Sequence, residues 1–291
     1  MRPENLKSKI FLDGGDPGET KELIDLIGFV DGQTTNPSLI SKNPEARERI
    51  ARGDKFTEQE ILHFYKGVVN NLYGMIPHGS ISVEVYSDST TTAEQMYAQG
   101  EEMFQWIPNA HIKYPTTSAG LAAAELSIRA GMKVNMTLVF QQQQAAAIYS
   151  ATRGANKGDV FVSPFVGRLD DRGENGMELI ANILKMYRNG DGHVEVLTAS
   201  VRTYDHLLYA LQLGSDIITA PFKALKEWGE KGLPVPGNDY VYSSGNLKAI
   251  PYIELDLSGK WQEFDNSHEL TDKGLEKFAA DWNSLIKKSS F

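Results

Sequence analysis

Lys113 is the residue whose setting points most directly to chemistry. It stands inside the apolar segment His111–Pro115, where a lysine would have no solvated face to occupy. Burial disfavours the charged ammonium, and an uncharged amine can attack a carbonyl and form a Schiff base. The alternative is a lysine paired with Asp13 or Glu84 that has no further role. The residues alone leave both interpretations open.

Two carboxylates accompany this lysine on other apolar segments. Asp13 closes the segment Lys9–Asp13, and Glu84 lies in Ile81–Val85. Two carboxyl groups beside an amine can serve as acid and base in different proton transfers. Either one could instead only balance the charge of Lys113. Together with the lysine they form the set of groups that carbon–carbon cleavage through an imine requires.

Arg168 and Arg202 each follow a later apolar segment, and Ser163 and Ser200 supply hydroxyls close to them. Guanidinium groups in the late loops of an α/β barrel can form a phosphate clamp. The arginines could also be solvated or paired with the acidic residues at 170 and 171. The pattern therefore indicates an anion site without proving one.

Four further polar residues occur at the ends of apolar segments: Thr35, Asn36, Asn135 and Thr137. Inward-pointing polar groups need hydrogen-bond partners, because unpaired ones cost several kcal/mol. Asn36 and Asn135 could orient the hydroxyl groups of a substrate, or they could only cap loops. The sequence does not decide between these two roles.

Eight short apolar segments that alternate with helical ones must position these residues. The predicted strands are Lys9–Asp13, Phe29–Thr35, Ile81–Val85, His111–Pro115, Val134–Phe140, Val160–Phe165, Val194–Ser200 and Asp216–Pro221. Single helices between Val/Ile-rich strands indicate parallel pairing. Eight such units over about 220 residues favour a (β/α)₈ barrel of the α/β class, with the active site at the C-terminal ends of the strands.

The intervening segments carry helix signals. Thr57 with Glu60, and Thr91 with Glu94, have the spacing of a capping box. The other predicted helices are 121–130, 142–152, 177–187 and 204–213. We expect one domain over residues 1–291, with 232–291 as an appendage packed on the barrel. Within it, 232–268 holds a short strand at 252–257 and 275–285 forms a helix, while 41–56 is a charged loop or short helix.

The composition of the chain narrows the range of possible functions. The 291 residues carry 29 basic and 38 acidic side chains, a net charge of −9, which disfavours nucleic-acid binding. There is no cysteine, and the six histidines have no metal-ligand spacing. The first residues lack the apolar core of a secretory signal, and no run of about 18 apolar residues predicts a membrane span. We therefore expect a cytoplasmic location.

Seven motifs resemble the transaldolase family in order and spacing. They are FLDGGDPGETKEL from Phe11, TTNPSLI at Thr34–Ile40, SVEV at Ser82–Val85, IKYP at Ile112–Pro115, NMTLVF at Asn135–Phe140, SPFVGRLDD at Ser163–Asp171 and ASVRT at Ala199–Thr203. The closing ELTDKGLEKFAADW is similar to the C-terminal helix of that family. The resemblance covers roughly residues 9–230 and 269–285.

The resemblance implies a Schiff-base aldolase-type barrel without metal or organic cofactor. It makes Lys113 the Schiff-base lysine, Asp13 the acid/base of carbon–carbon cleavage, and Glu84 an acid/base acting through a water that Thr137 positions. It assigns the dihydroxyacetone hydroxyls and the phosphate of a sugar phosphate to further residues. These are Thr35, Asn36, Asn135, Ser163, Phe165, Arg168, Ser200 and Arg202. The partners implied are small sugar phosphates and further copies of the chain, in a dimer or a larger ring.

Alternatives within and outside this family remain. Fructose-6-phosphate aldolases, which release dihydroxyacetone, typically carry Gln and Tyr where this chain has Glu84 and Phe165, so both positions look like a transaldolase. Gly14-Gly15 and Gln33 depart from the usual pattern and put the donor preference in doubt. A sulfonated sugar would use the same lysine chemistry. A sugar-phosphate-binding barrel without catalysis would need only the two arginines.

Overall fold

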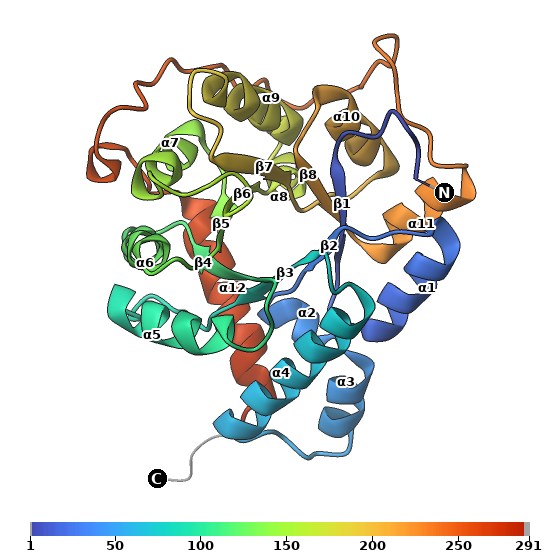
Figure 1. Cartoon of the computed structure of the whole chain (residues 1–291), viewed down its shortest axis with the longest axis vertical. Coiled ribbons are helices and arrows are strands. Elements are labelled where there is room, and N and C mark those ends of the chain that lie inside the picture. Colours follow the sequence, from blue (N-terminus) through green and yellow to red (C-terminus); the bar gives the residue numbers. More distant parts are fainter. Residues whose placement is uncertain (1, 288–291) are drawn as a thin grey trace.

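The computed structural model describes residues 2–287 and contains a closed barrel of eight parallel strands in sequence order (Figure 1). The strands are β1 (Lys9–Asp13), β2 (Gly32–Thr34), β3 (Ser80–Glu84), β4 (Ala110–Pro115), β5 (Val134–Val139), β6 (Val160–Pro164), β7 (Val194–Thr198) and β8 (Ile217–Ala220). The predicted (β/α)₈ fold is confirmed. Each predicted strand is present, and β2 is the one whose start lies furthest inside its predicted range.

Helices surround the barrel, and those that precede α11 connect successive strands (Figure 1). They are α1 (Pro17–Ile27), α2 (Pro37–Ser41), α3 (Pro44–Ala51), α4 (Glu58–Met75), α5 (Ala93–Phe104), α6 (Ser118–Arg129), α7 (Gln142–Ala151), α8 (Val166–Asp171), α9 (Gly176–Tyr187), α10 (Tyr204–Leu213), α11 (Phe222–Glu230) and α12 (Glu269–Leu285), with a 3₁₀ turn η1 (Trp261–Glu263). The predicted charged insertion at 41–56 thus contains helix α3.

Helix starts follow capping chemistry, with one correction. The capping box of Thr57 and Glu60 is present at the start of α4. The box at the start of α5 uses Thr92 and Gln95, so the prediction of Thr91 with Glu94 is wrong. The hydroxyl of Thr91 donates to a carboxylate oxygen of Asp88 at 2.9 Å instead. An Asx-type turn therefore takes the first threonine and leaves the second to cap the helix.

The segment after α11 runs along the outside of the molecule past α10 and α9 to α7 (Figure 1). The expected strand at 252–257 is absent from the described residues, and this segment packs on helices instead. The side chain of Gln142 both donates to and accepts from the backbone of Ile253. Gln144 donates to Asn266 O at 3.2 Å and to Thr271 Oγ1 at 2.8 Å. The glutamine side chains at the start of α7 therefore hold the C-terminal segment.

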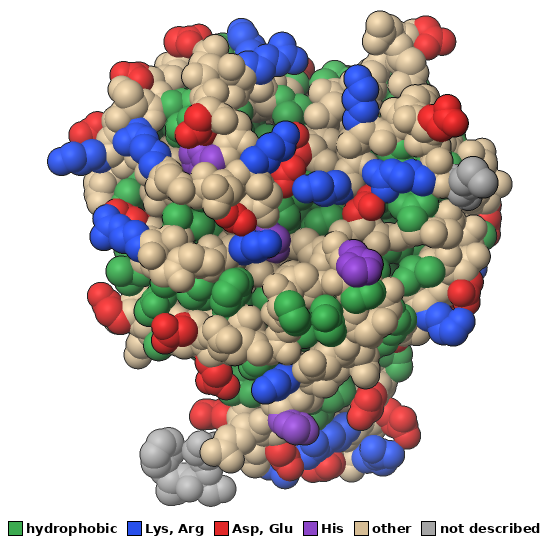
Figure 2. Space-filling view, in the orientation of Figure 1, with side chains coloured by type: hydrophobic (Ala, Val, Ile, Leu, Met, Phe, Trp, Pro, Cys, Tyr) green, Lys and Arg blue, Asp and Glu red, His purple; other side chains and the backbone are tan. Residues whose placement is uncertain are grey.

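Acidic and basic side chains are intermixed over the face of the molecule that Figure 2 shows. The negative net charge of the chain therefore does not set the local charge everywhere on the surface. Between residues 2 and 287, none of the helices has the length and apolarity that crossing a membrane would require.

Candidate active site

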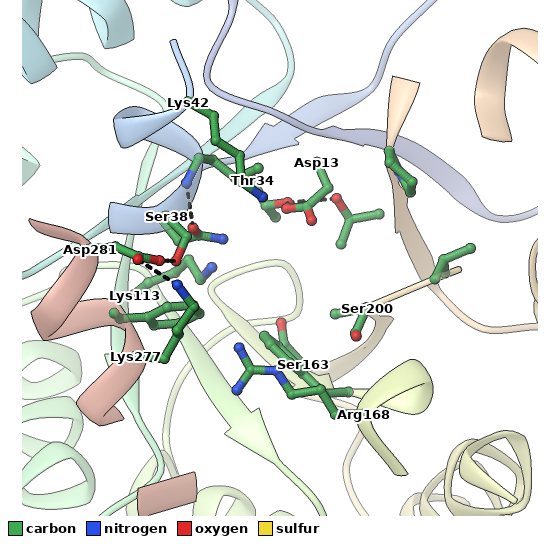
Figure 3. A pocket seen from close by; sticks show the side chains of 18 of the residues that line it. Asp13, Thr34, Ser38, Lys42, Lys113, Ser163, Arg168, Ser200, Lys277 and Asp281 are labelled. Carbon is green, nitrogen blue, oxygen red and sulfur yellow. Dashed lines mark hydrogen bonds and ion pairs between the residues drawn. The ribbon is translucent and has the colours of Figure 1, made fainter. Parts of the chain in front are cut away.

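The C-terminal ends of the strands surround a pocket of about 450 Å³ (Figure 3). Barrels of this type carry their catalytic groups at this end. The predicted residues that line the pocket are Asp13, Asn36, Lys113, Ser163, Phe165, Arg168, Ser200 and Arg202. Helix α12 adds Lys277, Phe278 and Asp281, and α2 adds Ser38 and Ser41. Residues from almost the whole length of the chain therefore meet at one site.

Lys113 and Glu84 are register partners on the neighbouring strands β4 and β3. Partners in register point to the same side of the sheet, so their side chains meet inside the barrel. The Nζ of Lys113 lies 3.0 Å from Glu84 Oε2, and the two side chains are 3% and 2% exposed. Nζ also donates to Thr35 O at 3.1 Å. The amine is thus buried, held at a fixed position and adjacent to a proton acceptor.

Burial dominates the electrostatics of both carboxyl groups. It raises the pKa of Glu84 above its ordinary value, and the nearby Lys113 opposes this rise in pKa. Burial likewise raises the pKa of Asp13, against the effects of Lys113 and of the hydrogen bond from Thr34. Thr34 Oγ1 donates to Asp13 Oδ1 at 2.7 Å and orients the carboxyl group. Both groups are therefore closer to exchanging protons near neutral pH than an exposed carboxylate.

Two predicted residues, Asn135 and Thr137, lie on β5 and are completely buried. Asn135 donates to Ser82 Oγ at 3.0 Å and accepts from Ser163 Oγ at 2.6 Å, which ties β5 to β3 and β6. The hydroxyl of Thr137 is buried and has no hydrogen-bond partner among residues 2–287. A buried hydroxyl is normally paired, so Thr137 has capacity to hold a small polar ligand or water.

Asn36 and Thr35 have different positions relative to the pocket. Asn36 caps helix α2, since its Oδ1 accepts from the amide of Leu39 at 2.9 Å, and its side chain also contributes to the pocket wall. Thr35 is fully buried, and its hydroxyl donates to Ser82 O and contacts the phenol of Tyr65. The Thr35 side chain therefore forms hydrogen bonds inside the barrel wall.

Arg168 lies between two aromatic rings at the pocket wall. Its Cζ is 5.3 Å from the ring centre of Phe165 and 5.4 Å from that of Phe278. Burial and the charge of Arg202 lower the pKa of Arg168. Arg202 is half exposed and pairs with Asp171 at 2.9 Å. The two guanidinium groups line one pocket, as an anion site requires.

Helix α12 contributes to the site in ways that the sequence analysis missed. A Cβ on Gly274 would come within 2.7 Å of Arg168 Nη1, so this glycine provides the space that the guanidinium occupies. Thr271 donates to Leu138 O at 2.9 Å, where β5 bulges and Leu138 takes a left-handed backbone conformation, with φ of 61°. The signal for Gly274 in the sequence was a glycine within an otherwise strong helix.

Gly14, Gly15 and Gln33, which depart from the usual family pattern, lie together around the loop after Asp13. Gln33 donates to Gly14 O at 2.9 Å and accepts from Thr20 Oγ1 at 2.8 Å. A Cβ on Gly15 would lie 2.7 Å from Leu39 O, so only glycine permits this close approach to α2. The loop after Asp13 is therefore held in place on both sides.

Comparison with known proteins agrees with this geometry. A family model described as Transaldolase/Fructose-6-phosphate aldolase matches residues 10–289. A Brucella ovis protein named "Probable transaldolase" is 38% identical over 280 residues, which cover 96% of this chain and 99% of that protein. Proteins of the same name from Paracoccus denitrificans and Dehalococcoides mccartyi are 35% and 32% identical; the matches cover 96% of this chain in both cases, and 99% and 100% of those proteins. The chain belongs to the transaldolase/fructose-6-phosphate aldolase family.

Proposed function

We propose that this protein is a transaldolase that acts through a Schiff base on Lys113. It would transfer a dihydroxyacetone unit from a ketose phosphate, such as fructose 6-phosphate or sedoheptulose 7-phosphate, to an aldose phosphate. The observation that carries the proposal is the buried Lys113 amine, 3.0 Å from Glu84, in a pocket that Asp13 and Arg168 also line. A buried ion pair of this kind contributes little to the stability of a fold, because the desolvation cost offsets the attraction. A nucleophilic lysine amine, in contrast, needs a buried position beside a group that can take its proton.

Imine formation begins with proton transfer from the Lys113 ammonium to Glu84. The raised pKa of Glu84 favours this transfer because burial disfavours the carboxylate. The neutral amine attacks the C2 carbonyl of the ketose, and Glu84 returns the proton to the departing hydroxyl, which leaves as water. The Thr137 hydroxyl, which has no partner among residues 2–287, supports a role in orienting a water in this step. The product is a cationic imine that withdraws electrons from the C3–C4 bond.

Carbon–carbon cleavage then uses Asp13 as the base. Its carboxyl group removes the proton of the C4 hydroxyl, the C3–C4 electron pair moves into the imine, and an aldose phosphate leaves. The resulting enamine attacks the carbonyl of the second aldose phosphate, and Asp13 returns the proton to that oxygen. The hydrogen bond from Thr34 Oγ1 supports this role, since it orients one carboxyl oxygen and leaves the other for substrate.

Phe165 supports transfer of the unit over its release. Its ring lines the pocket, is 8% exposed and carries no hydroxyl that could protonate the enamine or hold water there. The second candidate activity is that of a fructose-6-phosphate aldolase, which the family description names and which would release free dihydroxyacetone. The absence of a hydroxyl at this position thus favours transfer over release.

The test measures both outcomes in one assay. The enzyme is given fructose 6-phosphate with and without erythrose 4-phosphate, and sedoheptulose 7-phosphate and free dihydroxyacetone are quantified. We expect sedoheptulose 7-phosphate to form and free dihydroxyacetone to stay at trace level. Phe165→Tyr should increase the released fraction, and Phe165→Leu, which adds no hydroxyl, serves as the matched control. Release as the main reaction of the unmodified enzyme would contradict the proposal.

A further inference from the structure

Tyr65 of helix α4 reaches the barrel wall behind the Lys113–Glu84 pair. Its side chain is fully buried, and its ring packs edge-on against Trp106 and against Trp282 of α12, with centroid distances of 5.7 and 5.9 Å. Its phenol oxygen accepts from the amide of Glu84 at 2.9 Å and lies 2.5 Å from Thr35 Oγ1. A core tyrosine from the outer layer thus contacts the backbone of a proposed catalytic residue.

The directions of these hydrogen bonds follow from valence. Thr35 Oγ1 donates its only proton to Ser82 O at 2.7 Å, because a carbonyl oxygen can only accept. The phenol of Tyr65 must therefore donate to Thr35 Oγ1, while it accepts from the Glu84 amide. Burial raises the pKa of Tyr65, which keeps this donor proton in place. The result is a directed chain of bonds across α4, β2 and β3.

This chain occupies a position where the sheet ladder is interrupted. Thr34 pairs with Ser82 in the register of β2 and β3, and the amide of Thr35 donates to Ser82 O. The next bond of a parallel ladder would run from the Glu84 amide to Thr35 O. Glu84 N–H donates to Tyr65 instead, and Thr35 O accepts from Lys113 Nζ at 3.1 Å. Tyr65 therefore takes the amide that would otherwise compete for the partner of the lysine.

We propose that Tyr65 is a positioning residue that keeps Thr35 O available to the Lys113 amine and fixes the backbone of Glu84. This inference rests on the proposed Schiff-base function. Without the phenol oxygen, the Glu84 amide is free to re-form the ladder bond with Thr35 O. Thr35 O is then shared between two donors, which weakens the contact that holds Lys113 Nζ in place. Imine formation should slow while phosphate binding at the arginines persists, since these lie on other elements.

The test compares Tyr65→Phe with Tyr187→Phe. Tyr187 is also buried, and its phenol donates to Ala145 O at 2.8 Å, so this control loses a similar hydrogen bond outside the site. The readouts are kcat, KM for fructose 6-phosphate, melting temperature and the rate at which borohydride traps an adduct on Lys113. We expect Tyr65→Phe to lower kcat and the trapping rate about 10- to 100-fold with KM changed less than about threefold. Tyr187→Phe should change melting temperature only.

Two results would overturn the inference while leaving the proposed function intact: unchanged trapping and kcat in Tyr65→Phe, or a loss no larger than in the control. Failure of the unmodified enzyme to form an adduct on Lys113 would overturn the proposed function instead. If Tyr65→Phe does not fold, Thr35→Val tests the same chain by removing the acceptor of the phenol. Thr35→Val should lower kcat and Thr35→Ser should restore it, and equal activity of the two would contradict the inference.

Discussion

The two ends of the barrel each hold a lysine–glutamate pair, and the pairs differ in solvation. At the C-terminal end, Lys113 and Glu84 are 3% and 2% exposed. At the N-terminal end, Lys9 Nζ lies 3.0 and 3.1 Å from the two carboxylate oxygens of Glu195, but its side chain is 44% exposed. A solvated lysine costs little free energy, whereas a pair buried on both sides carries a large desolvation cost. Stability alone thus explains only the N-terminal pair.

The hydrogen bonding of a buried side chain at each end differs in a similar way. At the N-terminal end, both ring nitrogens of His111 have partners, Ser80 Oγ at 2.8 Å and Gly158 O at 2.9 Å, and the ring stacks on Phe161. At the C-terminal end, the Thr137 hydroxyl has no such partner within residues 2–287. The buried His111 ring is thus fully paired at one end, whereas the buried hydroxyl of Thr137 retains hydrogen-bonding capacity at the other.

The largest expected difference comes from removing each lysine in turn. Lys113→Met should lower turnover by about 10⁴-fold or more, since it removes the amine on which the imine is proposed to form. Lys9→Met should keep turnover within about twofold and cost about 1–3 kcal/mol of stability, because the buried carboxylate of Glu195 loses its partner. Steady-state kinetics and urea unfolding of both variants measure this. Comparable activity losses in the two variants would remove the functional distinction between the ends.

Cations at the two ends should differ in substrate binding. Arg168→Ala should raise KM for fructose 6-phosphate by about 10- to 100-fold, because a charge-assisted bond to phosphate is lost. Lys133→Ala is the control, since Lys133 lines a second pocket at the N-terminal end. Its KM should match that of the unmodified enzyme. A KM that does not respond to Arg168→Ala would place the phosphate elsewhere.

Removing a hydroxyl should affect activity at the C-terminal end of the barrel and stability at the N-terminal end. Thr137→Val should lower kcat about 10-fold without loss of stability, because this buried hydroxyl has no partner among the described residues. Ser80→Ala should leave kcat unchanged and cost about 1–3 kcal/mol, because it leaves His111 Nδ1 buried and unpaired. Chemical unfolding with parallel kinetics gives both quantities. The comparison fails if Thr137→Val is unstable and fully active.

A pH dependence of stability is expected from His111 at the N-terminal end. Burial lowers the pKa of His111 from 6.5 to about 4. Below pH 6.5 the unfolded chain binds a proton that the folded protein does not, so stability falls as pH decreases toward 4. The full effect is about 3 kcal/mol, or about 1.4 kcal/mol per pH unit.

Urea unfolding between pH 7 and pH 4.5 measures this slope. The difference in slope between the unmodified protein and His111→Gln isolates the contribution of the histidine, whatever the stability of the variant at pH 7. Parallel curves for the two proteins would show that His111 titrates equally in both states.

The sequence was informative where strand ends converge. That Lys113, Glu84 and Asp13 lie near one another could be predicted, because a barrel brings the ends of its strands together. Tyr65 could not, since within an amphipathic helix it looks like any core tyrosine and its partner at Thr35 lies 30 residues away. The sequence at 252–257 predicted a strand, but these residues pack against the outside of helices instead. A segment that covers helices also mixes apolar and polar residues, so the sequence did not separate the two structures. The need for glycine at position 274 could not be predicted, because it depends on the position of the Arg168 side chain beside it.

The most direct test of the central claim is borohydride reduction in the presence of fructose 6-phosphate, followed by peptide mass mapping. Reduction of the imine should add a dihydroxyacetone-derived or hexose-phosphate-derived mass to the peptide that contains Lys113, and Lys113→Met should abolish the adduct. Tight binding of the sugar phosphate with no adduct on Lys113, or an adduct on another lysine, would contradict the proposed Schiff-base mechanism.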